Sequence, residues 1–141
     1  MKRFTSYIYL LLLAAIACCC NKPLDITQDY AFDLLTMPYP KKISQGETIE
    51  IRCQISREGN YSGTKFFIRY FQTDGKGELR LDDGRVLTPN DLFSLTGDVF
   101  RLYYTSHCAD QQNIDIYIED NFGQVVMKSF SWQNETGKNE E

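Results

Sequence analysis

Three consecutive cysteines, Cys18, Cys19 and Cys20, are the residues of this sequence whose type and spacing could most directly do chemistry. Thiolates bind zinc, pair in disulfides and react with electrophiles. Adjacent cysteines cannot easily turn several thiolates toward one tetrahedral zinc, and the C-x2-C spacing of zinc sites is absent. We therefore predict no metal site here, and the neighbouring sequence decides between the remaining roles.

The segment before these cysteines has the layout of a secretory signal. Lys2 and Arg3 lie in a short charged start, and the uncharged run YIYLLLLAAIA follows over residues 7–17. A membrane span takes about 20 apolar residues, so this run is too short for one. A small residue directly before a cysteine resembles the lipobox of bacterial lipoproteins, in which the thiol receives a diacylglycerol and the signal is cut before the cysteine.

Cys18 fits a lipobox best, because Ala17 precedes it. Cys20 is a weaker candidate that would leave two cysteines before the cut, although Asn21 after it begins a polar stretch; Cys19 is also weaker. Several acyl chains hold a protein on a membrane, whereas one chain binds only reversibly. We therefore expect a fatty-acyl (palmitate-type) anchor in the cell envelope, on the outer membrane or the periplasmic face. An ordinary signal peptide followed by a cysteine cluster is the alternative.

Two more cysteines, Cys53 and Cys108, lie in the body of the chain. Cys53 belongs to an alternating apolar stretch and is expected to point inward, while Cys108 belongs to the polar stretch SHCADQQ. The compartment after export permits disulfides. A bridge between the two stays open, and two free thiols are favoured.

The other candidates for catalysis are better explained as structural. His107 is the only histidine, which excludes a zinc site built mainly of histidines. Ser106 and Cys108 are its neighbours, but sequence neighbours rarely point at one reacting atom. The stretch DGKG at 74–77 lacks the full phosphate-loop pattern and lies between strand signals, so we predict a hairpin turn there.

Two pairs of acids, Asp82–Asp83 and Glu119–Asp120, could in principle hydrolyse a glycan or bind calcium. Both pairs lie next to turn signals, where Asp is favoured for backbone reasons. We therefore predict no catalytic, cofactor-binding or metal site and no enzyme. A peptidoglycan-acting hydrolase stays as an alternative.

Strands are the elements that must position these residues. Clean alternation at 48–56 and 113–119 predicts two half-buried strands. Further strand signals lie at 31–37, 64–72, 99–105 and 124–132, with a hairpin at 77–87. About seven or eight strands with short turns favour an all-β fold, a single immunoglobulin-like sandwich of antiparallel strands. We place a signal at 1–17, a tether at 18–29, the sandwich at 30–133 and a disordered tail at 134–141.

The charge pattern argues against nucleic acid as a partner. The chain has 15 Lys+Arg and 19 Asp+Glu, a net charge of −4, and the basic residues are scattered among acids. Direct binding of DNA or RNA usually rests on a basic footprint. We therefore expect no direct contact with nucleic acid.

Two long segments, KKISQGETIEIRCQISREGNYSGTKFFIRYFQTDGKGELRLDDG and RLYYTSHCADQQNIDIYIEDNFGQ, resemble the TraQ-like lipoproteins of conjugative transposons in Bacteroidetes. The resemblance runs from about Leu24 to Trp132 and implies a lipid-anchored structural or accessory component of a conjugative transfer apparatus. Such a component would act through contacts with other conjugation or envelope proteins, with a surface adhesin or ligand-binding lipoprotein as a further alternative. Only the lipidated cysteine carries over from the family, whose single cysteine before Asn or Asp favours Cys20 where the lipobox favours Cys18.

Overall fold

The computed structural model describes residues 29–135, which form β-strands and connecting loops with no helix. The predicted signal and nearly all of the predicted tether lie outside the described residues, as does most of the predicted tail. The strands are β1 (Phe32–Thr36), β2 (Lys42–Ile43), β3 (Thr48–Arg57), β4 (Phe66–Asp74), β5 (Gly77–Leu81), β6 (Val86–Leu87), β7 (Phe93–Ser94), β8 (Val99–Ser106), β9 (Gln112–Asp120) and β10 (Val125–Asn134).

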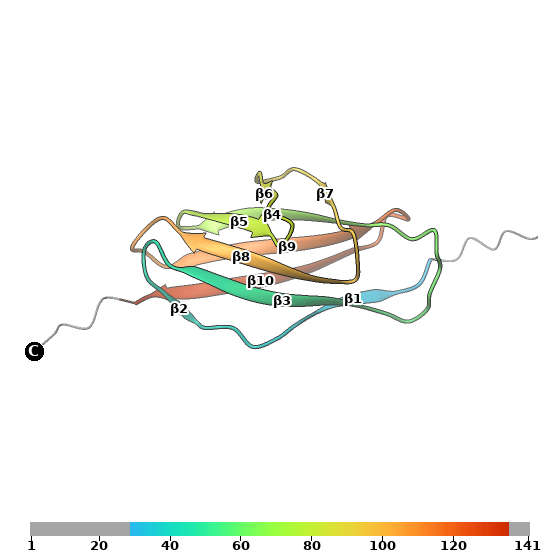
Figure 1. Ribbon diagram of the computed structural model, residues 1–141, viewed down its shortest axis with the longest axis horizontal. Helices are drawn as coiled ribbons and strands as arrows, with labels where there is room; N and C mark the ends of the chain where they lie inside the picture. The colour runs from blue at the N-terminus through green and yellow to red at the C-terminus, as the bar shows by residue number, and fades with distance from the viewer. Residues whose placement is uncertain (1–28, 136–141) are drawn as a thin grey trace, which may run out of the picture.

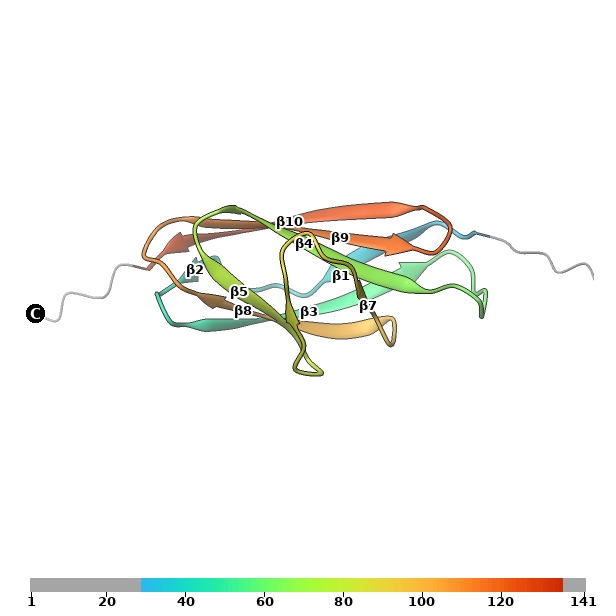
Figure 2. The ribbon, with the colours of Figure 1, turned by 90° about the horizontal axis from the view of Figure 1, so that it is seen from above.

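The strands form two five-stranded sheets, in the orders β1-β3-β8-β5-β6 and β2-β10-β9-β4-β7. Figure 2 shows the two layers, with β9 and β10 along one side of the molecule and β3 and β8 along the other. The first four strands of one sheet and β10-β9-β4 of the other have the order of the ABED and GFC sheets of an immunoglobulin domain. The predicted all-β, immunoglobulin-like sandwich is therefore confirmed.

One pair departs from the expected antiparallel arrangement. The chain leaves β1 in the first sheet, crosses over, and enters the second sheet as β2, which pairs with β10 in parallel. A two-residue strand in the turn-rich stretch 38–47 gives no alternation to detect, and the same holds for β7.

The hairpin predicted at 74–77 is wrong. β4 pairs with β9 and β7, whereas β5 pairs with β8 and β6, so this turn carries the chain from one sheet to the other. Gly75 adopts a positive φ of 74°, which suits a tight turn of either kind, and the residue pattern therefore could not separate the two. The hairpin predicted at 77–87 is confirmed, since Leu79 lies opposite Leu87.

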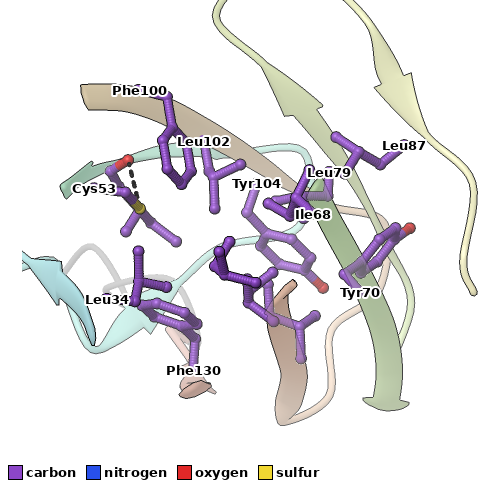
Figure 3. Packing of buried hydrophobic residues seen from close by; sticks show 14 of the residues in the cluster. Leu34, Cys53, Ile68, Tyr70, Leu79, Leu87, Phe100, Leu102, Tyr104 and Phe130 are labelled. Carbon is purple, nitrogen blue, oxygen red and sulfur yellow. Dashed lines mark hydrogen bonds between the residues drawn. The ribbon is translucent and has the colours of Figure 1, made fainter. Parts of the chain in front are cut away.

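The core fills the space between the sheets (Figure 3). The inward residues of the two alternating strands are buried as predicted; they are Ile49, Ile51, Cys53, Ile55, Ile114, Ile116 and Ile118. A polar chain, which consists of the hydrogen-bonded side chains of Tyr104, Gln112 and Ser106, is buried next to the apolar core. The Tyr104 hydroxyl donates to Gln112 Oε1 at 2.6 Å, and Gln112 Nε2 donates to the Ser106 hydroxyl at 2.6 Å. Buried polar groups that satisfy one another in this way help to fix a single packing.

Candidate functional site

The cysteine triplet predicted to carry the lipid, Cys18 to Cys20, lies outside the described residues. The other two cysteines are free in the structure, so the disulfide left open between them is not formed. Cys53 lies opposite Phe100, near the start of β8, while Cys108 follows the end of that strand at Ser106. The six steps along the strand from Phe100 to Ser106 span about 20 Å, and a disulfide needs Cα atoms within about 7 Å.

The neighbours Ser106, His107 and Cys108 do not converge. The Ser106 hydroxyl points inward and donates to the carbonyl oxygen of Cys108 at 2.9 Å. His107 is exposed, and its backbone N–H donates to the carbonyl oxygen of Lys76 at 2.9 Å. Cys108 Sγ accepts a hydrogen bond from the Lys76 N–H at 3.2 Å. These residues hold one turn against another rather than forming a nucleophile–base pair.

The two acid pairs lie in different sheets. Asp83 follows β5 and accepts hydrogen bonds from the backbone and side chain of Arg85, which hold the pKa of its carboxyl below the usual value. Asp120 ends β9 and accepts hydrogen bonds from the backbone N–H groups of Phe122 and Gln124 at 3.0 and 2.8 Å. Both acids stabilise turns. Within residues 29–135 no group of three or more His, Cys, Asp or Glu could hold a metal ion.

A different surface stands out, the outer face of β1, β3 and β8. Leu35, Gln54 and Val99 lie side by side in register across these strands. The exposed fraction is 48% for Leu35 and 72% for Val99. Apolar side chains that are exposed singly are common, whereas exposed apolar side chains that lie next to one another are typical of a contact surface.

The next row across the same strands combines an apolar side chain with two cations. Met37 follows β1, is 62% exposed, and its N–H donates to the carbonyl oxygen of Arg52 at 3.0 Å. Arg52 lies directly opposite Arg101. Both guanidinium groups share one carboxylate, Glu50, at 2.8 and 3.6 Å, and the hydrogen bond from Arg52 lowers the pKa of Glu50. Glu50 lies in the following row, opposite Tyr103, and with it the group carries one more positive than negative charge.

We call these two rows, together with Glu50 from the following row, the β1-β3-β8 face; it consists of Leu35, Met37, Glu50, Arg52, Gln54, Val99 and Arg101. A depression runs between its strands at the level of the two rows, and its lining contains both arginines and no acidic residue. An apolar floor with cations at its margin suits a protein ligand, because apolar contact gives affinity and charges select the partner.

The free edge of β1 beside this face is protected against strand addition at Leu34. The Leu34 N–H is taken by Asp33 Oδ1 at 2.8 Å, and the Leu34 carbonyl oxygen accepts a hydrogen bond from Lys128 Nζ at 3.2 Å. Lys128 points inward from β10, in the other sheet. An inward lysine at a sheet edge is a known protection against edge-to-edge pairing. The available contact surface here is therefore the face of the sheet and not its edge.

Alternation in the sequence predicts that Glu50, Arg52 and Gln54 lie on one face of their strand, and the structure places them on the outer side of β3. It could not reveal their neighbours, because the register that sets Val99 and Arg101 beside them joins distant segments.

In the described part of the chain no helix is long and apolar enough to cross a membrane.

Comparison with known proteins gives a consistent result. Residues 3–135 match the family model described as TraQ conjugal transfer protein. No curated protein matches the chain.

Three solved structures resemble the described domain. A conjugative transposon lipoprotein from Bacteroides eggerthii is 41% identical, with a TM-score of 0.70, over 74% of this chain and 98% of that one. A lipoprotein from Bacteroides thetaiotaomicron is 54% identical, with a TM-score of 0.70, over 86% and 94%. A conjugate transposon protein from Bacteroides vulgatus is 42% identical, with a TM-score of 0.68, over 85% and 98%.

Proposed function

Because this chain belongs to the TraQ conjugal transfer family, we propose that it is a lipid-anchored component of the cell envelope that contacts other proteins of a transfer apparatus through its β1-β3-β8 face. In this role it performs no chemistry and binds no nucleic acid directly. The exposed row of Leu35 and Val99 beside the Arg52–Arg101 pair carries the proposal. The similar structures that are themselves described as lipoproteins support the anchor.

The contact is best tested by placing a charge on the face. Leu35→Asp and Val99→Asp each put a carboxylate into the apolar row, at positions whose exposure leaves the core untouched. We expect each substitution to lower the frequency of conjugative transfer from donor cells at least tenfold. Met127→Asp is the matched control, since Met127 is 53% exposed but lies on the outer face of the other sheet. Amounts of membrane-bound protein should be equal in all three.

Two results would contradict the proposed contact surface. One is normal transfer by Leu35→Asp and Val99→Asp in cells where the variants accumulate normally. The other is an equal loss with Met127→Asp, which would point to both sheets or to general instability.

The anchor is tested separately, with single substitutions Cys18→Ser, Cys19→Ser and Cys20→Ser. We propose that Cys18 is the lipidated residue, so that only Cys18→Ser abolishes incorporation of labelled palmitate and release of the signal. The mass of the N-terminal peptide of the mature protein identifies the modified residue independently. Loss of labelling with Cys20→Ser alone would move the lipid to Cys20.

A further inference from the structure

A second depression adjoins the β1-β3-β8 face at Met37. It lies between β10 and the segment that carries the chain from β1 to β2, and Thr36 and Met37 line both depressions. Its other lining residues are Pro38, Tyr39, Lys41, Lys128 and Ser129. We call it the crossover cleft.

Two lysines give the crossover cleft its charge. Lys41 Nζ lies 3.6 Å from the centroid of the Tyr39 ring, a cation–π contact, and Lys128 Nζ donates to the Leu34 carbonyl oxygen. An ammonium group has three N–H donors. Among residues 29–135 neither lysine forms an ion pair with a carboxylate. All five ion pairs in this part of the chain have arginine as the cation.

The two depressions together carry Arg52, Arg101, Lys41 and Lys128 in their linings and no acidic residue. Glu50 pairs with both arginines from outside these linings, so the two lysines are the cations of the linings that have no carboxylate partner among residues 29–135. The ring of Tyr39 packs against the core residues Phe130 and Trp132, with centroids 5.2 and 5.8 Å away, so the wall beside Lys41 is held by the core. A wall fixed in this way is suited to binding without rearrangement.

We propose that the crossover cleft binds an Asp or Glu carboxylate in an extended segment of a partner protein, whose neighbouring apolar side chain rests on Leu35, Met37 and Val99. This inference rests on the proposed function and specifies the chemistry of its partner. A cationic cleft and an apolar surface that meet at one exposed methionine match an acidic, amphipathic segment in charge and in polarity. Methionine adapts its shape to apolar ligands.

A photo-crosslinking experiment in donor cells tests this inference. The full-length lipoprotein carries p-benzoylphenylalanine in place of Met37, and the crosslinked partner peptide is sequenced by mass spectrometry. We expect that peptide to carry Asp or Glu within about three residues of the crosslink. The double substitution Lys41→Gln with Lys128→Gln should lower the crosslinking yield at least tenfold. Lys65 is an exposed lysine that directly precedes β4 and does not line the cleft, so Lys65→Gln should leave the yield unchanged.

A reciprocal substitution shows whether the carboxylate and the lysines act on each other. Changing the identified acid of the partner to its amide should reduce the yield to the same extent, with no further loss when the lysines are also changed. Thermal unfolding of each purified variant, within 2 °C of the parent, shows that the loss is not a loss of folding.

The outcomes separate this inference from the function on which it rests. Crosslinks that persist without the lysines, or that map to a segment without acids, overturn the carboxylate site and leave the contact face standing. Crosslinks to lipid or to a second copy of the chain overturn the proposed partner. A second full-length variant carries p-benzoylphenylalanine in place of Val99. If neither this variant nor the Met37 variant gives a crosslink to a protein, the proposed contact face itself is wrong.

Discussion

Tyr104 of β8 stacks face to face on Trp132 of β10, with ring centroids 4.4 Å apart and ring planes 2° apart, so one aromatic pair joins the two sheets. Both rings are fully buried. The hydroxyl of Tyr104 extends beyond the stack and enters the polar chain through Gln112. This pair therefore couples the apolar core to the turns that follow β4 and β8.

Removing that hydroxyl should destabilise the fold. Tyr104→Phe keeps the stacked ring but leaves buried Gln112 Oε1 without its 2.6 Å donor. Leaving a buried polar group unsatisfied costs about 1–3 kcal/mol, so we expect a loss of that size in the free energy of unfolding, measured with urea. Tyr103→Phe, on the outer face beside Arg80, is the control. Equal effects of the two substitutions would contradict the assigned role.

Alkaline pH should weaken the fold through the same residue. Burial raises the pKa of Tyr104 from 10.0 to about 12. Between pH 10 and pH 12 the unfolded chain binds fewer protons than the folded one. The contribution of Tyr104 to the free energy of unfolding is therefore fully present below pH 10 and falls as pH rises toward 12. Urea unfolding at several pH values should show this decline, and Tyr104→Phe should make it shallower. An identical slope in both proteins would exclude Tyr104 as its source.

Close packing around the turn between β4 and β5 predicts that replacing Gly77 by a larger residue destabilises the fold. A Cβ on Gly77 would lie 2.3 Å from the Tyr104 hydroxyl oxygen and 2.7 Å from the backbone oxygen of Thr105. Overpacking typically costs about 1–3 kcal/mol, and we expect Gly77→Ala to lower the free energy of unfolding by an amount in this range. Gly97→Ala is the control, because the nearest atom to its Cβ is 4.0 Å away. A neutral Gly77→Ala would show that the turn relaxes.

The two body cysteines should differ in reactivity. Cys53 is buried, and this burial raises the pKa of its thiol to about 12, whereas Cys108 is only half-buried. The thiolate is the reactive form. Iodoacetamide at pH 8 should therefore label Cys108 in the folded protein and Cys53 only after denaturation, as followed by peptide mass spectrometry. A peptide pair linked through the two cysteines would contradict their assignment as free thiols.

Lys128 should protect the edge of β1. Lys128→Met removes the ammonium that occupies the Leu34 carbonyl oxygen and leaves that oxygen free for another strand. We expect dimers or larger species at concentrations where the parent protein is monomeric, measured by sedimentation velocity. Lys65→Met changes an exposed lysine in a loop and should leave the size unchanged. A monomeric Lys128→Met variant would show that other features close this edge.

The sequence predicts the long strands of this fold better than its connections. Alternation identifies β3 and β9 because one face of each is buried, so Ile51 and Ile116 could be placed in the core. The residues at 74–77 predict a hairpin, but glycine suits a hairpin and a crossing between sheets equally well. Only the pairing of β5 with β8, set by tertiary packing, decides between them.

The candidate surface depends even more on tertiary structure. Alternation predicts that Arg52 lies on the outer side of its strand, but its neighbour Arg101 is 49 positions further along and becomes adjacent only through the register of β3 and β8. Lys128 is the only charged residue of β10, and nothing in the sequence of that strand indicates that its side chain reaches β1. Surfaces assembled across strands leave no local motif.

The parallel pair of β2 and β10 has a mechanical consequence. The described chain enters and leaves at opposite ends of the long axis (Figure 1), and Gln133 and Glu135 donate to the carbonyl oxygens of Lys41 and Ile43. Tension between the two chain ends would slide these strands past each other, so both hydrogen bonds resist together in shear instead of opening one after the other. A domain held at its N-terminus would in this way keep its shape under a pulling force.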